Sequence, residues 1–143
     1  MRIVILATEP SGDFLGSKLI KNLKKNKKVV ISGVGGEQMK AAGFQSWVQI
    51  NQFNAIGIFE VLIRILKFLK LFKLIQRKIL DFNPDILITI DSPSFSYRIV
   101  SRLQDLRKNT QFIHYVAPTV WAWKSYRAKI FDDQQNWFQA QIF

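Results

Sequence analysis

The chain has 143 residues, of which 48% are hydrophobic and 22% charged, a balance typical of a single folded domain rather than a disordered segment. It contains no cysteine and one histidine, which excludes disulfides and a cysteine nucleophile and argues against a zinc site. Its formal net charge of +11 indicates an anionic partner, whether nucleic acid, anionic lipid or a phosphorylated substrate.

The first 23 residues predict the opening unit of a parallel α/β fold. The apolar run from Ile3 to Leu6 precedes a turn of small and acidic residues, and apolar residues then recur at spacings of three and four. The short apolar run and the acidic turn do not resemble a secretory signal. Ligands of parallel sheets bind beyond the carboxyl ends of the strands, which makes the turn at residues 7–13 a candidate site.

The chemistry of this turn leaves two interpretations open. Ser11 is expected to cap the following helix, and Gly12 permits the close approach of a ligand or of backbone. Glu9 and Asp13 make the turn acidic, so it suits sugar hydroxyls or a transferable proton, and it matches no nucleotide-binding glycine motif. A capped turn with solvated carboxylates explains the same residues.

The rest of the chain continues the alternation of strands and helices. Residues 29–31 predict a strand that ends in a glycine-rich turn, 37–42 a short helix stopped by Gly43, and 44–50 a weak strand. Residues 86–90 predict the clearest strand, 97–107 a helix and 111–116 a fifth strand. We therefore expect an α/β fold with a doubly wound parallel sheet and no internal domain boundary.

Residues 55–80 predict the longest helix, which carries one basic stripe on an otherwise apolar surface. The polar positions recur every three or four residues: Glu60, Arg64, Lys67, Lys70, Lys73 and Arg77. They interrupt every apolar run of about eighteen residues, which argues against a transmembrane span. The apolar arc is too wide for one sheet, so we predict that the four cations from Arg64 to Lys73 face an anionic membrane surface. A core helix packed on two sides is the alternative.

Two further stretches follow predicted strands. Asp91 ends the clearest strand, where active sites of parallel sheets gather, although an Asp there also caps a following helix. After the fifth strand, Trp121 and Trp123 lie beside several cations, including Arg127, and are suited to stack on a sugar, a base or a lipid headgroup. His114 lies within that strand, where a single histidine is more often a packed core residue than a base.

Five stretches occur in an order that is specific as a set. They are ATEPSGD at 7–13, GVGGEQM at 33–39, IGIFEVL at 56–62, IDSPSF at 90–95 and HYVAPTVWAWKSYRAKI at 114–130. Together they resemble the lipid-A-disaccharide synthases over residues 2–130, almost the whole chain.

The resemblance implies the Rossmann-like amino-terminal domain of a two-domain, GT-B-type glycosyltransferase. Enzymes of this family join UDP-2,3-diacylglucosamine to 2,3-diacylglucosamine 1-phosphate in lipid A biosynthesis, inverting the anomeric centre without a metal or other cofactor. They work in the cytoplasm, peripherally on the inner membrane of Gram-negative bacteria. The amino-terminal domain is expected to bind the acylated glucosamine phosphate acceptor, and the carboxyl-terminal domain the UDP-sugar donor.

The resemblance also implies roles for individual residues. Asp91 matches an aspartate that is a candidate base for the acceptor hydroxyl, and inverting transfer requires one such base. The other matching residues are expected to bind substrate: Ser11, Gly12, Asp13, Glu60, Trp121, Trp123 and Arg127.

The chain also departs from the family pattern. Ser94 stands where the family commonly has a second aspartate, and Ala117 and Thr119 replace residues that are often serine. We expect residues 131–143 to diverge from the family pattern and the nucleotide-sugar domain to be missing. We therefore expect a domain at 1–130, a divergent tail at 131–143, and a split, frameshifted or truncated product with little activity alone.

Two other functions compete with this interpretation. A non-catalytic, basic membrane-surface or lipid-binding module would also explain the cationic apolar helix. A nucleic-acid binder would explain the charge, but the cations lie on a helix rich in Phe and Leu, and no nucleic-acid motif is present. We therefore expect no nucleic-acid partner.

Overall fold

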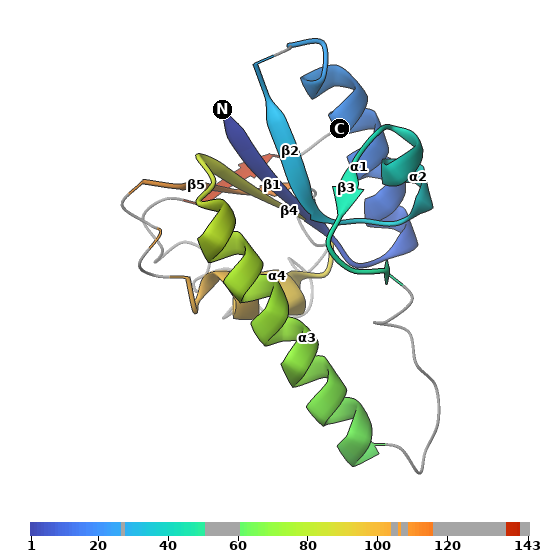
Figure 1. Cartoon of the computed structure of the whole chain (residues 1–143), viewed down its shortest axis with the longest axis vertical. Coiled ribbons are helices and arrows are strands. Elements are labelled where there is room, and N and C mark those ends of the chain that lie inside the picture. Colours follow the sequence, from blue (N-terminus) through green and yellow to red (C-terminus); the bar gives the residue numbers. More distant parts are fainter. Residues whose placement is uncertain (27, 51–60, 104–105, 107–108, 116–136, 141–143) are drawn as a thin grey trace.

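A computed structural model of the chain describes residues 1–26, 28–50, 61–103, 106, 109–115 and 137–140. Within these residues six strands form one parallel sheet (Figure 1). The strands are β1 (Arg2–Ala7), β2 (Val30–Val34), β3 (Gln45–Ser46), β4 (Ile86–Ile90), β5 (Gln111–Tyr115) and β6 (Trp137–Ala140). The helices are α1 (Pro10–Leu23), α2 (Glu37–Ala41), α3 (Val61–Phe82) and α4 (Pro93–Val100).

The strand order in the sheet is β3-β2-β1-β4-β5-β6, and every neighbouring pair is parallel. The chain moves outward from β1 in one direction and outward from β4 in the other, which confirms the predicted doubly wound fold. The order reverses between β1 and β4, whose pairing runs from Ile3 with Ile86 to Ala7 with Ile90. Their carboxyl ends therefore form the switch point at which sheets of this kind bind ligands.

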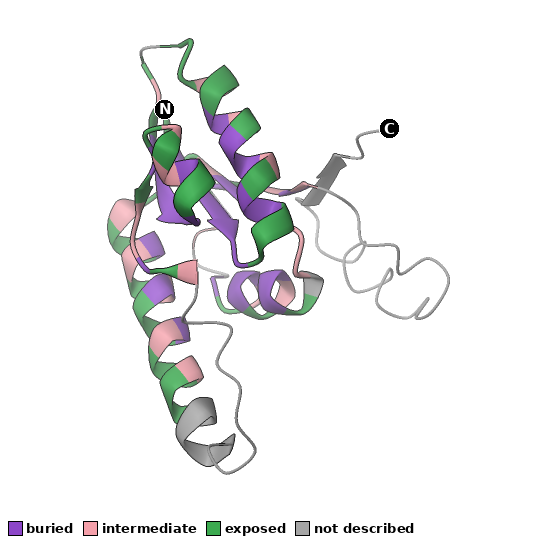
Figure 2. Ribbon diagram, turned by 90° about the vertical axis from the view of Figure 1, so that its right-hand side faces the viewer, coloured by how far each residue is buried: buried purple, intermediate pink, exposed green. Residues whose placement is uncertain are grey.

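Two apolar layers cover the sheet, because alternate residues of a strand face opposite sides. Val4 and Leu6 of β1 join a cluster with residues of α3 and α4, whereas Ile3 and Ile5 join a second cluster with residues of α1 and α2. Figure 2 shows the buried strands and the buried inner sides of the helices. Each fully buried Ile or Leu side chain contributes about 2 kcal/mol, so the apolar strands specify both layers.

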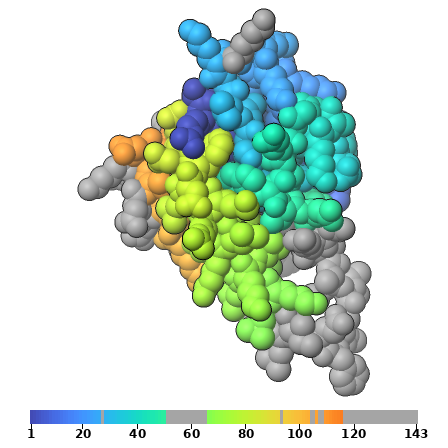
Figure 3. Space-filling view, viewed as in Figure 1, coloured from blue at the N-terminus to red at the C-terminus, as the bar shows by residue number. Residues whose placement is uncertain are grey.

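α3 packs against the sheet with one side only. The buried residues Phe72, Ile75 and Ile79 form its inner side. Its exposed leucines are Leu66 (60%), Leu69 (42%), Leu74 (42%) and Leu80 (46%). In Figure 3, α3 lies uncovered, in green, along the face in view. The exposed outer side favours the membrane-facing interpretation of α3 over a core helix packed on two sides. Of the predicted helix, residues 55–60 lie outside the described residues.

Three other elements differ from the sequence prediction. β3 is limited to two residues, which pair with Ser32 and Gly33 of β2. α4 begins at Pro93 rather than at residue 97, because proline suits the first turn of a helix. It ends at Val100 rather than at residue 107. The sheet has a sixth strand, β6, which pairs with β5 and was missed because its four residues stand among polar ones without a strand pattern.

Candidate functional site

The turns after β1 and β4 meet at the switch point and are joined by side-chain hydrogen bonds. Thr8 Oγ1 donates to Ser92 Oγ at 2.9 Å, and Ser92 Oγ donates to a carboxylate oxygen of Glu9. Ser11 Oγ donates to Asp91 Oδ2 at 2.8 Å. These bonds join residues that are 80 to 84 positions apart in the chain, so the pairing of β1 with β4 creates the cluster.

Asp91 occupies a strained turn. Its φ is 56° and that of Ser92 is 45°, two consecutive left-handed conformations that residues other than glycine seldom adopt. The Ser92 N–H donates to Asp91 Oδ1 at 2.9 Å, and Ser96 Oγ donates to the Asp91 backbone oxygen at 3.1 Å. With the bond from Ser11, each carboxylate oxygen has a donor, which fixes the direction of the carboxylate. Asp91 is half-buried, so solvent still reaches it.

Asp91 was expected either to lie in an active site or to cap the helix that follows it. The N-cap of α4 is Ser92, and α4 has no side-chain cap hydrogen bond. Asp91 is therefore not a helix cap. Its carboxylate instead belongs to the cluster of Thr8, Glu9, Ser11 and Ser92 at the end of β1 and β4.

Ser11 lies within α1 rather than before it. The N-cap of α1 is Glu9, which makes no side-chain cap hydrogen bond, and Pro10 is the first helical residue. The prediction that Ser11 caps this helix is wrong, because proline has a helical φ and no N–H and so starts the helix earlier. Ser11 is left free to orient Asp91.

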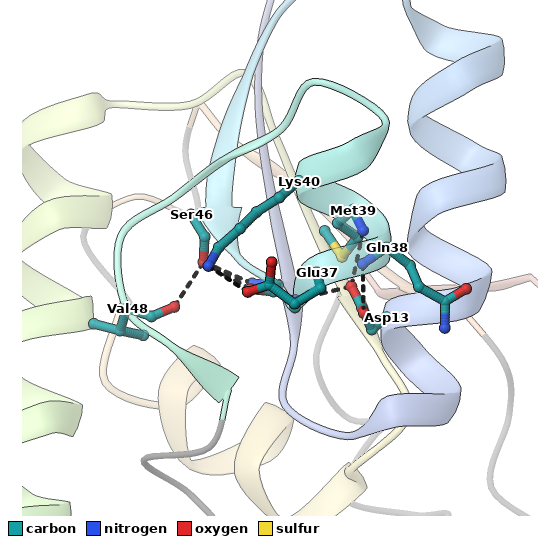
Figure 4. A network of polar contacts seen from close by, with 9 residues as sticks. Asp13, Glu37, Gln38, Met39, Lys40, Ser46 and Val48 are labelled. Carbon is teal, nitrogen blue, oxygen red and sulfur yellow. Dashed lines mark hydrogen bonds and ion pairs between the residues drawn. The ribbon is translucent and has the colours of Figure 1, made fainter.

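Asp13 binds the backbone of α2 (Figure 4). Its Oδ1 accepts the N–H groups of Gly36 at 2.8 Å and Met39 at 3.0 Å, and its Oδ2 accepts that of Gln38 at 3.0 Å. These are unsatisfied donors at a helix N-terminus, so a residue of α1 caps α2. Asp13 is only 6% exposed, and the geometry favours this structural role. Its predicted contact with substrate stays a prediction.

Gly12 permits a close approach of α1 to the sheet. A Cβ atom at this position would lie 3.3 Å from both Ala7 Cβ and the Ile90 backbone oxygen, so a larger residue fits only if these neighbours shift by a few tenths of an ångström. Close packing of α1 on the sheet accounts for a glycine at position 12, and its contact with substrate stays a prediction.

His114 is a core residue. It is 1% exposed on β5, and its Nδ1 lies 2.7 Å from Thr89 Oγ1 on β4. Burial lowers the pKa of His114 from 6.5 to about 4, although the nearby charge of Asp91 acts in the opposite direction. The imidazole is therefore neutral near pH 7, and the interpretation as a packed, hydrogen-bonded histidine is confirmed.

A hollow of about 350 Å³ opens beside the cluster. It is lined by Glu9 and Ser92 of the two turns, by Ser94, Phe95 and Arg98 of α4, and by Phe68 of α3. The hollow thus combines hydroxyl groups, an acid, a cation and two aromatic rings, and its lining residue Ser92 is the sequence neighbour of Asp91. Such a mixture suits a ligand with a polar head and an apolar part.

The sequence comparisons agree with one another. A family model described as lipid-A-disaccharide synthetase matches residues 3–138. The chain belongs to this family. It is 44% identical over 128 residues to the lipid-A-disaccharide synthase of Rickettsia bellii (strain OSU 85-389), an alignment that covers 89% of the chain and 34% of that protein. The corresponding enzyme of Rickettsia prowazekii (strain Madrid E) is 43% identical over 136 residues, covering 92% of the chain and 36% of the relative.

The chain therefore spans about a third of the length of the curated lipid-A-disaccharide synthases that it matches. Among solved structures it is similar to the calicheamicin glycosyltransferase CalG4, with a TM-score of 0.49 and 15% sequence identity. That alignment covers 98% of this chain and 38% of CalG4.

Several residues assigned to the lipid-A-disaccharide synthase site from the sequence lie outside the described part of the chain. They are Glu60, Trp121, Trp123 and Arg127. The side chain of Arg64 is also outside it, whereas Lys67, Lys70 and Lys73 are exposed on α3.

The sequence reasoning missed Thr8, Ser92 and Arg98 as site residues. Thr8 and Ser92 could have been found from their positions directly after two predicted strands. Arg98 lies inside a predicted helix, and its place in the lining of the hollow depends on tertiary packing, for which the sequence carries no signal. Among the described residues no three His, Asp or Glu side chains gather closely enough to hold a metal ion.

Proposed function

We propose that this chain forms the acceptor-side part of a lipid-A-disaccharide synthase, which joins UDP-2,3-diacylglucosamine to 2,3-diacylglucosamine 1-phosphate with inversion. The single observation that carries the proposal is the carboxylate of Asp91, held by donors from Ser11 and Ser92 at the switch point of the sheet. Membership of the family supports glycosyl transfer in lipid A synthesis as the reaction class.

The reaction assigns a task to each of these groups. An acceptor hydroxyl must lose its proton as its oxygen attacks the anomeric carbon and UDP leaves, and Asp91 takes that proton. Ser11 and Ser92 aim the carboxylate, because each donates to a different oxygen of it. A positioned base of this kind typically contributes 10²- to 10⁴-fold in rate.

The UDP-sugar donor belongs to the part of the family proteins that this chain does not cover. The chain spans 34% of the Rickettsia bellii relative, and the hollow described above is lined by Glu9, Phe68, Ser92, Ser94, Phe95 and Arg98, a lining that we assign to the acceptor. We expect little turnover from this chain alone, because the UDP leaving group needs a binding site of its own.

The membrane is the second partner in the proposal. The outer side of α3 combines exposed leucines with the exposed lysines Lys67, Lys70 and Lys73. Leucine buries in the boundary of the acyl chains while lysine is attracted to anionic headgroups, at about 1 kcal/mol per cation. No helix among the described residues is long and apolar enough to cross a bilayer. A peripheral site on the inner face of a Gram-negative inner membrane, where acylated substrates reside, fits this side of α3.

The test is turnover of the chain mixed with the carboxyl-terminal part of the Rickettsia bellii synthase, measured as disaccharide formed from both acylated substrates. Asp91→Asn should lower the rate at least 100-fold, because an amide cannot accept the proton. Asp81→Asn is the matched control: it removes the same charge from an exposed position on α3 and should leave the rate unchanged. A rate for Asp91→Asn within threefold of wild type would remove Asp91 from the mechanism.

Turnover of the same mixture distinguishes the proposed function from the competing one. A non-catalytic lipid-binding module would sediment with anionic vesicles but give no disaccharide when the missing part is supplied. Disaccharide formation that depends on Asp91 would exclude that alternative.

A further inference from the structure

The hollow beside Asp91 has walls of three different chemistries. Ser92 and Glu9 form the wall nearest to Asp91, since Ser92 is its neighbour in sequence and donates to Glu9. Phe68 and Phe95 form an aromatic wall between α3 and α4. Arg98, one turn after Ser94 on α4, supplies a cation.

Arg98 is available to a ligand. Its side chain is exposed. The ion pair found among the described residues joins Lys40 to Glu37 and does not involve Arg98. Arg98 and Glu9 line the same hollow without forming an ion pair with one another. A guanidinium group presents its N–H donors in a planar fork that matches a phosphate group, so an anion is the natural occupant of this side.

The aromatic wall gives the ligand its second property. The ring of Phe95 packs edge-on against Phe72 at a centroid distance of 5.9 Å, and the ring of Phe68 lies 6.2 Å from the same ring. The wall is therefore continuous with the apolar core. Phe68 also belongs to α3, the helix that carries the exposed leucines, so an acyl chain leaving the hollow along this wall would follow α3 toward lipid.

We propose that this hollow binds the head of a singly phosphorylated, acylated sugar with the phosphate on Arg98, the first acyl carbons against Phe68 and Phe95, and a sugar hydroxyl toward Ser92 and Asp91. This assignment rests on the proposed function and deepens it, because it states how the acceptor lies. The volume of about 350 Å³ suits a sugar head and the first carbons of its chains rather than a whole lipid.

The assignment is tested by equilibrium binding of the 143-residue chain to two probes in neutral detergent micelles. The probes are 2,3-diacylglucosamine 1-phosphate and the same compound without its phosphate. Arg98→Gln should weaken binding of the phosphorylated probe about tenfold and leave binding of the other unchanged, because it removes charge-assisted hydrogen bonds to the phosphate alone. Arg98→Lys should fall between the two, since an ammonium group keeps the charge but loses the fork.

Arg77→Gln is the matched control. It removes the same charge from an exposed position on α3, and Arg77 does not line the hollow. It should leave the affinity for both probes within twofold, and circular dichroism should show that both variants are folded. An equal effect of Arg98→Gln on both probes, or no effect on either, would overturn the assignment of the phosphate to Arg98.

Failure of the proposed function gives a different result. A third probe, 1-acylglycerol 3-phosphate in the same micelles, carries a phosphate and an acyl chain but no sugar. If the wild-type chain binds this probe through Arg98 but binds neither glucosamine probe, the anion site is supported and the sugar acceptor is contradicted. Wild-type chain that binds none of the three would contradict both.

Discussion

Replacing Asp13 with alanine should destabilise the fold by about 4 kcal/mol. Its carboxylate accepts the N–H groups of Gly36 and Met39 in buried bonds and that of Gln38 in a partly buried one. A buried donor left without an acceptor costs about 1–3 kcal/mol, so two such donors give about 4 kcal/mol. The N–H of Gln38 is near enough to solvent to add little.

Urea unfolding followed by circular dichroism measures this free energy. Asp13→Asn should lose about half as much, because its amide keeps one acceptor oxygen for the three N–H groups. Asp81→Ala removes an exposed carboxylate and should change the free energy of unfolding by about 0.5 kcal/mol or less. Asp13→Ala within about 1 kcal/mol of wild type would refute the cap and return Asp13 to the substrate-binding role expected from the sequence.

Three further predictions concern α3, the core and pH. Changing Lys67, Lys70 and Lys73 together to Glu should reduce sedimentation with anionic vesicles by at least tenfold at low salt, because each cation contributes about 1 kcal/mol near the surface. Ile79→Ala should lower the free energy of unfolding by about 3 kcal/mol, because Ile79 is 0% exposed in the layer under α3. Lowering the pH from 6.5 toward 4 should reduce stability by about 1 kcal/mol per pH unit through His114, since its pKa is 6.5 unfolded and about 4 folded, so only the unfolded chain binds the proton in that window.

Each of these has a control and a result that would contradict it. The control for α3 changes the exposed residues Lys21, Lys25 and Lys28 to Glu, which makes the same change of charge away from α3. If this control loses as much vesicle binding as the α3 variant, net charge rather than α3 causes the loss. Leu80→Ala, next to Ile79 but 46% exposed, should cost much less, and equal costs would contradict the one-sided packing. A pH dependence of unfolding that persists in full in His114→Gln would show that other groups cause it.

Much of the fold follows from the sequence alone. The apolar runs of β1 and β4 are short, continuous and followed by small or acidic residues, so their type, their order and the position of Asp91 at the switch point could be predicted. The exposed apolar side of α3 also followed from the pattern, because its apolar arc exceeds what one sheet covers.

The site could be predicted only in part. That Ser11 orients Asp91 depends on a contact between residues 80 positions apart, which local capping preferences cannot reveal. The same holds for Asp13, whose sequence position suggests a free acid whereas the packing of α1 against α2 turns it into a cap. β6 was missed because pairing with β5, rather than local propensity, makes it a strand.

The most direct test of the central claim, that Asp91 acts as a base aimed by Ser11, is a double-mutant cycle on turnover in the mixture with the carboxyl-terminal part of the Rickettsia bellii synthase. Ser11→Ala should lower the rate about tenfold when Asp91 is present, because the carboxylate loses one of its two orienting donors. In the Asp91→Asn background the same change should have no further effect, since there is no base left to aim. Effects that multiply in full would contradict the claim and show that Ser11 and Asp91 act independently.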